Sequence, residues 1–159
     1  MTLYLVLKYL HVIGAAVLLG TGAGIAFFML LAHRTGEAAT VAAVARMVVI
    51  ADFVFTASAV VVQPITGALL MNELGIPLDE GWIALSLILY LVTGAFWLPV
   101  VWMQMRMRDL AREAAARGTA LPAAYHRLFR AWFWSGFPAF AAVMAIVWLM
   151  IAKPALTLP

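Results

Sequence analysis

The sequence predicts an all-α integral membrane protein, a four-helix bundle that runs up-down-up-down and forms a single transmembrane domain over residues 1–159. Of the 159 residues, 67% are hydrophobic and only 11% are charged, whereas a soluble domain has about 45–50% apolar and about 25% charged residues. The mean hydropathy is +1.06. A helix needs about 20 mostly apolar residues to cross a bilayer, and four stretches meet that length. They cover approximately residues 2–32, 41–71, 82–107 and 129–152.

We expect the first stretch to be retained as a helix rather than cleaved as a signal peptide. Its apolar run continues past Gly24 through IAFFMLLA, which is too long for the apolar region of a signal peptide, and no A-x-A-like cleavage site follows. The sequence contains no cysteine, which excludes disulfides and thiolate metal ligands. It also contains no glycine-rich phosphate loop and no zinc motif, so hydrolase and kinase interpretations have no residues to support them.

The arginines are divided unequally among the three connections. The first connection carries Arg34, with Arg46 just beyond it, whereas the second, NELGIPLDEG, contains no Lys or Arg. The third carries four arginines, namely Arg108, Arg112, Arg117 and Arg127. Because cytoplasmic loops carry the excess of Lys and Arg, we expect the first and third connections in the cytoplasm and both termini outside (N-out/C-out). This predicts a multi-pass protein of the bacterial inner membrane, and it explains the pI of about 9.7 without nucleic-acid binding. The third connection is expected to start as an amphipathic helical extension, ended by Gly118 and Pro122.

Each predicted span carries one stripe of polar or small residues at a step of 100° per residue. We expect these stripes to face the bundle interior, because an unpaired polar side chain is costly in lipid. His11, Gln63 and Tyr90 are predicted at one depth, and Asp52 lies deeper. The four stripes are Tyr4, Lys8, His11, Gly14, Ala15, Leu18 and Gly22; Asp52, Thr56, Ala59, Gln63 and Thr66; Ser86, Tyr90, Thr93, Trp97, Gln104 and Arg108; and Ala131, Ser135, Ala139, Ala142 and Lys153.

His11 is the one histidine predicted within lipid depth, and imidazole is both a metal ligand and a titrating group. A histidine beside Gly14 and Gly22 leaves open space of the kind that a porphyrin needs, and Lys8 would suit a haem propionate. The plainer interpretation is that His11 hydrogen-bonds Gln63 or Tyr90 while Lys8 extends to the interface.

Asp52 is a carboxyl group within a predicted span, where insertion of a charge costs about 2.5–3.5 kcal/mol. We therefore expect it to be paired or protonated. One alternative is a structural ion pair with Arg46, Arg106 or Arg108. The other is a proton relay or a substrate contact.

Two further patterns suggest metals or partners. The stretch WMQMRMR places Met103 and Met107 on one face, which invites a Cu(I) interpretation, although methionine is also ordinary filler in apolar helices. His33 and His126 lie at the predicted cytoplasmic rim and are expected to pair there or to be solvated. On the first span, a row of small residues (Ala16, Gly20 and Gly24) predicts either a homodimer face or close packing within the chain.

Several segments carry a resemblance to a known family. The chain closely resembles a bacterial family of predicted integral membrane proteins of unknown function, over essentially its whole length. That family resembles, more distantly, the CopD-like copper-resistance membrane proteins and the HemJ-type protoporphyrinogen IX oxidases, through Lys8-x-x-His11 and the four-helix topology. The segments are LKYLHVIGAAVLLGTGAGIAFFMLLAHR, VARMVVIADFVFT, QPITG, FWLPVVWMQMRM and WLMIAKPA.

The HemJ-like resemblance implies a b-type haem with His11 as its ligand and Lys8 as a propionate or porphyrin contact. The segment after the first span departs from the HemJ pattern, so the resemblance leaves the substrate open, with a quinone or porphyrin as the candidate partner. The CopD-like resemblance implies copper handling through His11 and methionines.

The preferred prediction is therefore a haem b protein that serves electron transfer or oxidises a lipophilic partner. In this prediction Asp52, Gln63 and Tyr90 line the site or supply protons for the reaction. A copper-handling protein and a cofactor-free structural or assembly subunit are the alternatives.

Overall fold

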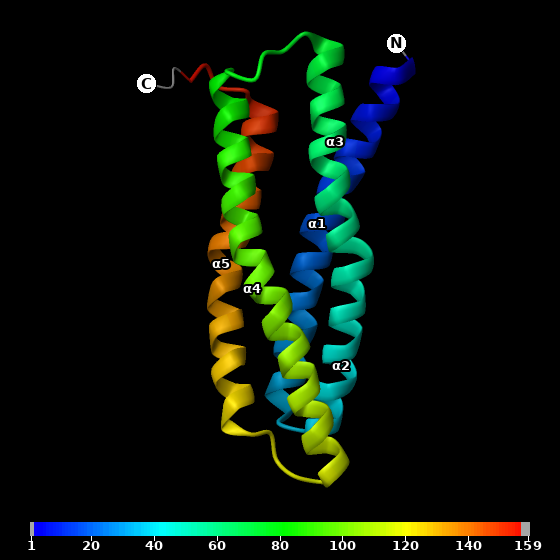
Figure 1. Cartoon of the computed structure of the whole chain (residues 1–159), viewed down its shortest axis with the longest axis vertical. Helices are drawn as coiled ribbons and strands as arrows, with labels where there is room; N and C mark the ends of the chain where they lie inside the picture. The colour runs from blue at the N-terminus through cyan, green and yellow to red at the C-terminus, as the bar shows by residue number, and fades with distance from the viewer. Residues whose placement is uncertain (1, 157–159) are drawn as a thin grey trace.

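The computed structural model describes residues 2–156 and is helical throughout, with no strand in that part of the chain (Figure 1). Four helical segments are long and apolar enough to cross a membrane, and they cover residues 2–35, 38–74, 81–117 and 123–152. This confirms the predicted all-α, four-helix membrane fold. The elements are α1 (Thr2–Thr35), α2 (Ala38–Ala51), the π-helical segment η1 (Asp52–Thr56), α3 (Ala57–Leu74), α4 (Gly81–Arg117) and α5 (Ala123–Ala152).

The helices continue further at one end of the bundle than the predicted spans do. We call this end, which holds the connections at residues 36–37 and 118–122, the arginine-rich end, and the opposite end, where both chain ends lie, the termini end (Figure 1). The predicted extension of the third span is confirmed, since α4 runs to Arg117. At about 1.5 Å per residue its 37 residues span about 55 Å, well beyond a hydrocarbon core of about 30 Å.

Two glycines in the left-handed region end α3 and α4. Gly75 and Gly118 each have φ of +63°, a conformation that costs little only for glycine. At both ends the next N–H bonds back to a carbonyl of the last turn: Ile76 to Met71 at 3.0 Å, and Thr119 to Ala114 at 3.0 Å. The predicted end at Gly118 is thus confirmed.

A five-residue π-helical segment, η1, interrupts the second span and was not predicted. Here the N–H of Ala57 donates to the carbonyl of Asp52, five residues earlier rather than four. Such segments widen the helix locally and occur frequently at functional sites. Asp52 and Thr56, the first and last residues of the π turn, are therefore candidate functional residues.

The apolar core is concentrated toward the arginine-rich end, where all the spans pack together. Met29, Val41 and Met107 are almost fully buried there, and Tyr125 is fully buried. This half of the bundle is therefore closed by close-packed hydrocarbon and aromatic side chains. The core residues are Ile25, Met29, Ala32, Val41, Ala45, Val48, Met103, Met107, Ala111, Leu121, Tyr125, Phe129 and Trp132.

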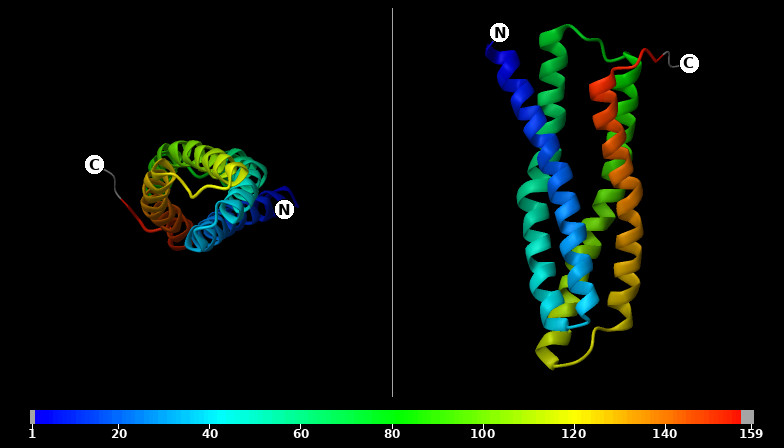
Figure 2. Two further views of the ribbon diagram at one scale, coloured as in Figure 1. Left: turned by 90° about the horizontal axis from the view of Figure 1, so that it is seen from below. Right: turned by 180° about the vertical axis from the view of Figure 1, so that it is seen from behind.

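Toward the termini end the bundle separates into two helix pairs. α1 stays beside α3 and α4 stays beside α5, and Figures 1 and 2 show the two pairs diverging. Three of the side chains buried in this half are polar, namely Gln63, Thr66 and Ser86. The other three buried polar side chains, Asp52, Thr56 and Gln104, lie deeper in the bundle.

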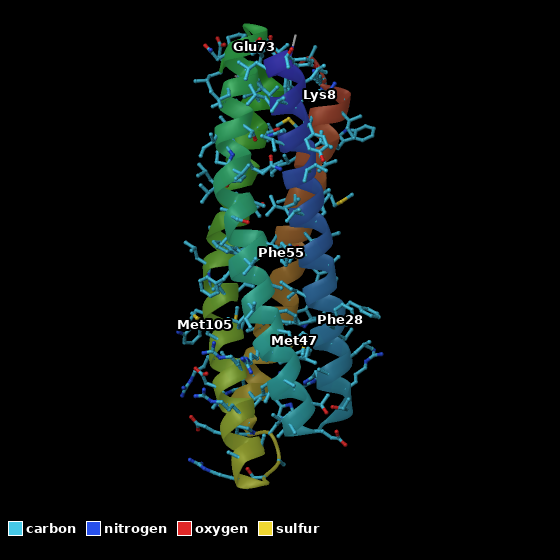
Figure 3. The ribbon with its side chains drawn as sticks, turned by 90° about the vertical axis from the view of Figure 1, so that its right-hand side faces the viewer. Lys8, Phe28, Met47, Phe55, Glu73 and Met105 are labelled. Carbon is cyan, nitrogen blue, oxygen red and sulfur yellow. The ribbon has the colours of Figure 1, made fainter. Side chains whose placement is uncertain are left out.

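Large apolar side chains cover the outside of the bundle. Phe28, Met47 and Phe55 project outward (Figure 3) and are 60%, 67% and 52% exposed. A soluble protein rarely exposes so continuous an apolar surface. In a bilayer this surface faces lipid, so the exposure follows directly from the membrane location.

Candidate functional site

The predicted polar stripe of the second span faces the bundle interior along its whole length. Its five residues are all buried, between 4% and 8% exposed, as predicted. The stripe of the first span is only partly correct, because Lys8 and Gly22 are exposed, while Leu7 and Ile25 are buried in their place. The buried stripe residues of the second span are Asp52, Thr56, Ala59, Gln63 and Thr66.

His11 meets Thr66 where α1 crosses α3. Its Nδ1 lies 2.9 Å from the Thr66 hydroxyl oxygen. That hydroxyl has one hydrogen, which it donates to the carbonyl of Val62 at 2.8 Å, so it accepts from Nδ1–H of His11. The assigned tautomer leaves Nε2 of His11 with a free lone pair. No hydrogen bond to Nε2 occurs within residues 2–156.

Gln63 hydrogen-bonds the backbone of α1 at His11. Its Nε2 donates to the main-chain carbonyl of His11 at 2.8 Å. The plainer prediction, that His11 hydrogen-bonds Gln63 or Tyr90, is confirmed for Gln63 through the His11 backbone, whereas the imidazole itself bonds Thr66. We call His11, Gln63 and Thr66 the histidine cluster.

The glycines predicted to leave room for a porphyrin do not share one open face. A Cβ atom at Gly14 would lie 2.8 Å from Nε2 of Gln63, so the amide fills the space that the sequence suggested was open. Gly22 is exposed and has no neighbour within 4 Å of its Cβ position. Lys8 is exposed too, with its Nζ 5.6 Å from the Tyr4 ring centroid (Figure 3). Glycine at position 14 thus allows α1 and α3 to approach closely.

The Tyr90 hydroxyl replaces a helical hydrogen bond that Pro64 removes. Proline has no N–H, so the carbonyl of Val60, four residues before Pro64, loses its usual helical partner. The hydroxyl of Tyr90 donates to that carbonyl from α4. This bond links the two diverging helix pairs, and it uses the only hydrogen that the Tyr90 hydroxyl can donate.

Deeper in the bundle, Asp52 forms a network with side chains of α4 and α5. Its Oδ1 accepts from Nε1 of Trp97 at 3.3 Å. In the amide orientation that satisfies its neighbours, Gln104 donates from Nε2 to Oδ2 of Asp52 at 2.9 Å and accepts from Nε1 of Trp132 at 3.3 Å. Together with Thr56, these residues make up what we call the Asp52 network.

The predicted ion pair of Asp52 with an arginine is wrong. Arg46 and Arg106 are exposed, and Arg108 pairs with its neighbour Asp109 at 2.9 Å instead. Asp52 forms no ion pair with any residue of the described part. Arginine side chains near a membrane boundary are long enough to reach water, and here they extend outward rather than inward to the buried carboxylate.

His33 and His126 come together at the arginine-rich end, as predicted. Their ring centroids are 5.6 Å apart in an edge-on arrangement. His33 also stacks on Phe129, with centroids 3.6 Å apart, and its Nδ1 lies 3.3 Å from the buried hydroxyl of Tyr125. Within residues 2–156 no group of three or more His, Cys, Asp or Glu side chains could hold a metal ion.

The methionines and small residues that suggested copper or a dimer have ordinary surroundings. Met103 and Met107 are buried in the apolar core. Gly20 and Gly24 have no neighbour within 4 Å of a Cβ position, so close packing of this row within the chain is wrong. The homodimer remains a prediction, on a face with a shallow apolar hollow lined by Ile13, Ala16, Val17, Gly20, Thr21 and Phe55.

Sequence reasoning missed Trp132 and Tyr125. The stripe predicted for the fourth span followed small residues and began at Ala131, which is exposed, whereas its bulky neighbour Trp132 is buried. Tyr125, Trp132, Ala142 and Leu149 are buried at intervals of seven or ten residues. A seven-residue spacing of large residues would have identified this face.

These features define the class: a four-helix integral membrane protein with polar clusters in its interior. Comparison with known families agrees, because the chain matches the model for the family described as "Predicted integral membrane protein (DUF2269)" over residues 5–154, and it belongs to that family. This confirms the resemblance to a family of unknown function. No significant match was found among curated proteins or among solved structures.

Gly14→Ala is expected to weaken the contact between α1 and α3. The new methyl group would displace the Gln63 amide and remove its bond to the His11 carbonyl, and such interhelical bonds in membranes contribute about 0.6 to 1.7 kcal/mol. Thermal unfolding in mild detergent measures the loss. Gly20→Ala is the matched control, since nothing lies within 4 Å of that Cβ position; equal stability of both variants would contradict the contact.

Tyr90→Phe is expected to destabilise the bundle by about 1 kcal/mol, because the Val60 carbonyl loses its donor inside the membrane. In a Pro64→Ala background the restored N–H of residue 64 would satisfy that carbonyl. The same Tyr90→Phe change should then cost clearly less in a double-mutant cycle of unfolding free energies. Additive effects would show that Tyr90 does not act through this carbonyl.

Proposed function

We propose that this protein binds a b-type haem through His11 in a bacterial inner membrane, and that it transfers electrons or oxidises a lipophilic partner of the quinone or porphyrinogen class. The observation that supports this most directly is the orientation of the imidazole. The Thr66 hydroxyl accepts from Nδ1–H of His11, which leaves Nε2 with a free lone pair.

The histidine cluster fits axial ligation. Histidines that bind metals almost always donate their other ring N–H to a hydrogen-bond acceptor, which fixes the tautomer and raises the basicity of the ligating nitrogen. The Thr66 hydroxyl supplies such an acceptor. A Cβ atom at position 67 would lie 3.3 Å from Cε1 of His11, so Gly67 lets the ring lie against α3. His11 would thus be the protein ligand, and a bound haem would supply reversible one-electron oxidation and reduction.

The structure favours different tasks for the other candidate residues. Gln63 donates to the His11 carbonyl and Tyr90 to the Val60 carbonyl. The Tyr90 hydroxyl has donated its single hydrogen, and the Gln63 amide is not a titrating group, so we assign both a positioning role. Asp52 remains as the group able to take up a proton. Lys8 lies at the surface near the termini end, where it would be available to a propionate only at the edge of the bundle.

The distribution of charge supports the proposed location and orientation. The arginines gather at one end of the bundle, and the connection between α3 and α4 at the opposite end has no Lys or Arg. By the positive-inside rule the arginine-rich end would face the cytoplasm. His11 would then lie in the outer half of the membrane.

His11→Ala is expected to abolish haem binding and leave a folded protein. The measurement is a visible spectrum of protein purified from cells supplied with a haem precursor, first oxidised and then reduced with dithionite. His126→Ala is the matched control, because that histidine is exposed at the arginine-rich end. Stoichiometric haem in the His11→Ala protein would overturn the proposal.

Thr66→Val is expected to weaken haem binding about 10- to 100-fold, the usual cost of losing the partner that orients a metal-bound histidine. Thr66→Ser keeps a hydroxyl and should bind nearly as the unaltered protein does. Titration of haem into apoprotein in detergent measures both affinities. If the valine variant binds haem as tightly as the serine variant, Thr66 does not orient the ligand.

A protein without visible absorption would point to the alternatives. Copper found by metal analysis and lost with His11→Ala would favour copper handling. A colourless protein that holds no metal and copurifies with a stable partner would favour a structural or assembly subunit.

A further inference from the structure

A buried carboxyl group with only neutral partners lies in the second span. Of the seven acidic side chains of the chain, Asp52 alone is buried, at 4% exposure, and the other six are exposed or half-exposed. It lies six residues, or about 9 Å, further into the span than Arg46. An ionised carboxylate in such surroundings is costly unless a cation compensates it, and otherwise the group takes up a proton.

The atoms around the carboxylate favour a proton over a metal ion. The neighbours Trp97 and Gln104 present N–H groups to it at 3.3 and 2.9 Å, and an indole or amide N–H has no lone pair for a cation. The amide oxygen of Gln104 accepts from Trp132 and is not free. A hard cation such as Ca²⁺ needs about six oxygen ligands, and this site cannot supply them.

Thr56 provides what a protonated carboxyl group needs. It lies four residues after Asp52 on the same buried face of the second span, and its buried hydroxyl has no hydrogen-bond partner within residues 2–156. Ser58, Thr66, Ser86 and Thr93 each donate to the carbonyl four residues earlier. For Thr56 that carbonyl belongs to Asp52, which in the π turn accepts from the N–H of Ala57, and the Thr56 hydroxyl makes no such bond. This hydroxyl is therefore available to the carboxyl group.

The surroundings of Asp52 differ on its two sides along the bundle. Toward the arginine-rich end the interior is filled by the apolar core, including Met29, Val48 and Met107. Toward the termini end, polar side chains recur about once per helical turn along α4, and the helix pairs diverge (Figure 2). A proton reaches a buried group through polar groups and water rather than through packed hydrocarbon. These polar side chains are Ser86, Tyr90, Thr93 and Trp97. Their hydrogens are donated to other acceptors, so water would carry the proton, and the three hydroxyl oxygens would accept hydrogen bonds from that water.

We propose that Asp52 is a proton-binding site, neutral at neutral pH, whose O–H donates to Thr56 and whose proton exchanges with water at the termini end. When the carboxyl O–H bond breaks, the proton passes to water and the carboxylate keeps the electron pair. The Thr56 hydroxyl then rotates and donates to the new carboxylate, beside the bonds from Trp97 and Gln104. The site gains or loses one unit of charge, and this does not depend on haem binding.

No other ionisable group pairs with Asp52 from the helices packed around it. His11 and His33 of α1 belong to clusters at other levels, bonded to Thr66 and Tyr125. Tyr90 of α4 donates to Val60, and Arg108 bonds Asp109. The remaining arginines near this level are exposed, namely Arg46, Arg106 and Arg130.

Infrared spectroscopy of the haem-free protein in liposomes tests the proposal. We expect a carboxylic-acid C=O band at neutral pH from Asp52, because the other six acidic side chains reach water. The band should disappear in Asp52→Asn and persist in Glu113→Gln, which removes an exposed carboxylate. Absence of the band at neutral pH in the unaltered protein, or its survival in Asp52→Asn, would overturn the proposal.

A substitution at Thr56 tests the hydrogen bond between its hydroxyl and the carboxyl group while Asp52 stays unchanged. Thr56→Val keeps the shape of the side chain and removes the acceptor, so the frequency of the acid band should shift. Thr93→Val is the control, because the Thr93 hydroxyl bonds the Leu89 carbonyl at 2.8 Å. An identical band in Thr56→Val and the unaltered protein would overturn the assigned hydrogen bond.

The side of the membrane with which the Asp52 proton exchanges is measured in vesicles. The vesicles are first sorted by whether a tag on the N-terminus is accessible from outside. The acid band should follow the pH of the compartment that the termini end faces, and stay constant when only the other compartment is changed. A band that follows the compartment at the arginine-rich end would overturn the proposed route of proton exchange.

Discussion

A polar atom inside this bundle that has no partner within the protein is costly, because hydrocarbon offers none. The Val60 carbonyl, freed by Pro64, is met by Tyr90, and the Trp97 indole is met by Asp52. These bonds cross between helices that are far apart in sequence. The same requirement that makes a polar side chain expensive in lipid therefore also fixes which helices pair and at what register.

The need for partners explains why the two halves of the bundle differ. Near the arginine-rich end the helices hold together through buried apolar and aromatic side chains such as Met29, Met107 and Tyr125. Toward the termini end few large apolar side chains are buried, and hydrogen bonds such as that between His11 and Thr66 join the helices. The proposed ligand site lies in this half, and the proposed route of proton exchange leads through it.

The spans and the interior face of the second span were predictable from the sequence, because hydropathy and helical periodicity determine them directly. Asp52, Gln63 and Thr66 were placed correctly since their polarity forces them inward. Lys8 and Gly22 were placed wrongly on the same reasoning. A lysine near a membrane boundary can reach water, and a glycine has no side chain whose polarity could decide its direction.

The partners of the buried groups were much harder to predict. One of the two alternatives predicted for Asp52 was an ion pair with an arginine, yet its neighbours are an indole and an amide. The π turn at Asp52–Thr56 depends on how the whole span packs, and no short sequence motif predicts it. Periodicity assigns a residue to a face, whereas a partner depends on the register between helices.

The divergence of the two helix pairs gives the molecule a tapered outline, broader toward the termini end (Figure 1). A tapered protein takes up more area in one leaflet than in the other. Lipids beside the narrow half must fill the difference, which favours a membrane that bends around the wide end. The separation of α1 and α3 from α4 and α5 therefore gives this protein a larger cross-section in the leaflet at its termini end than in the opposite leaflet.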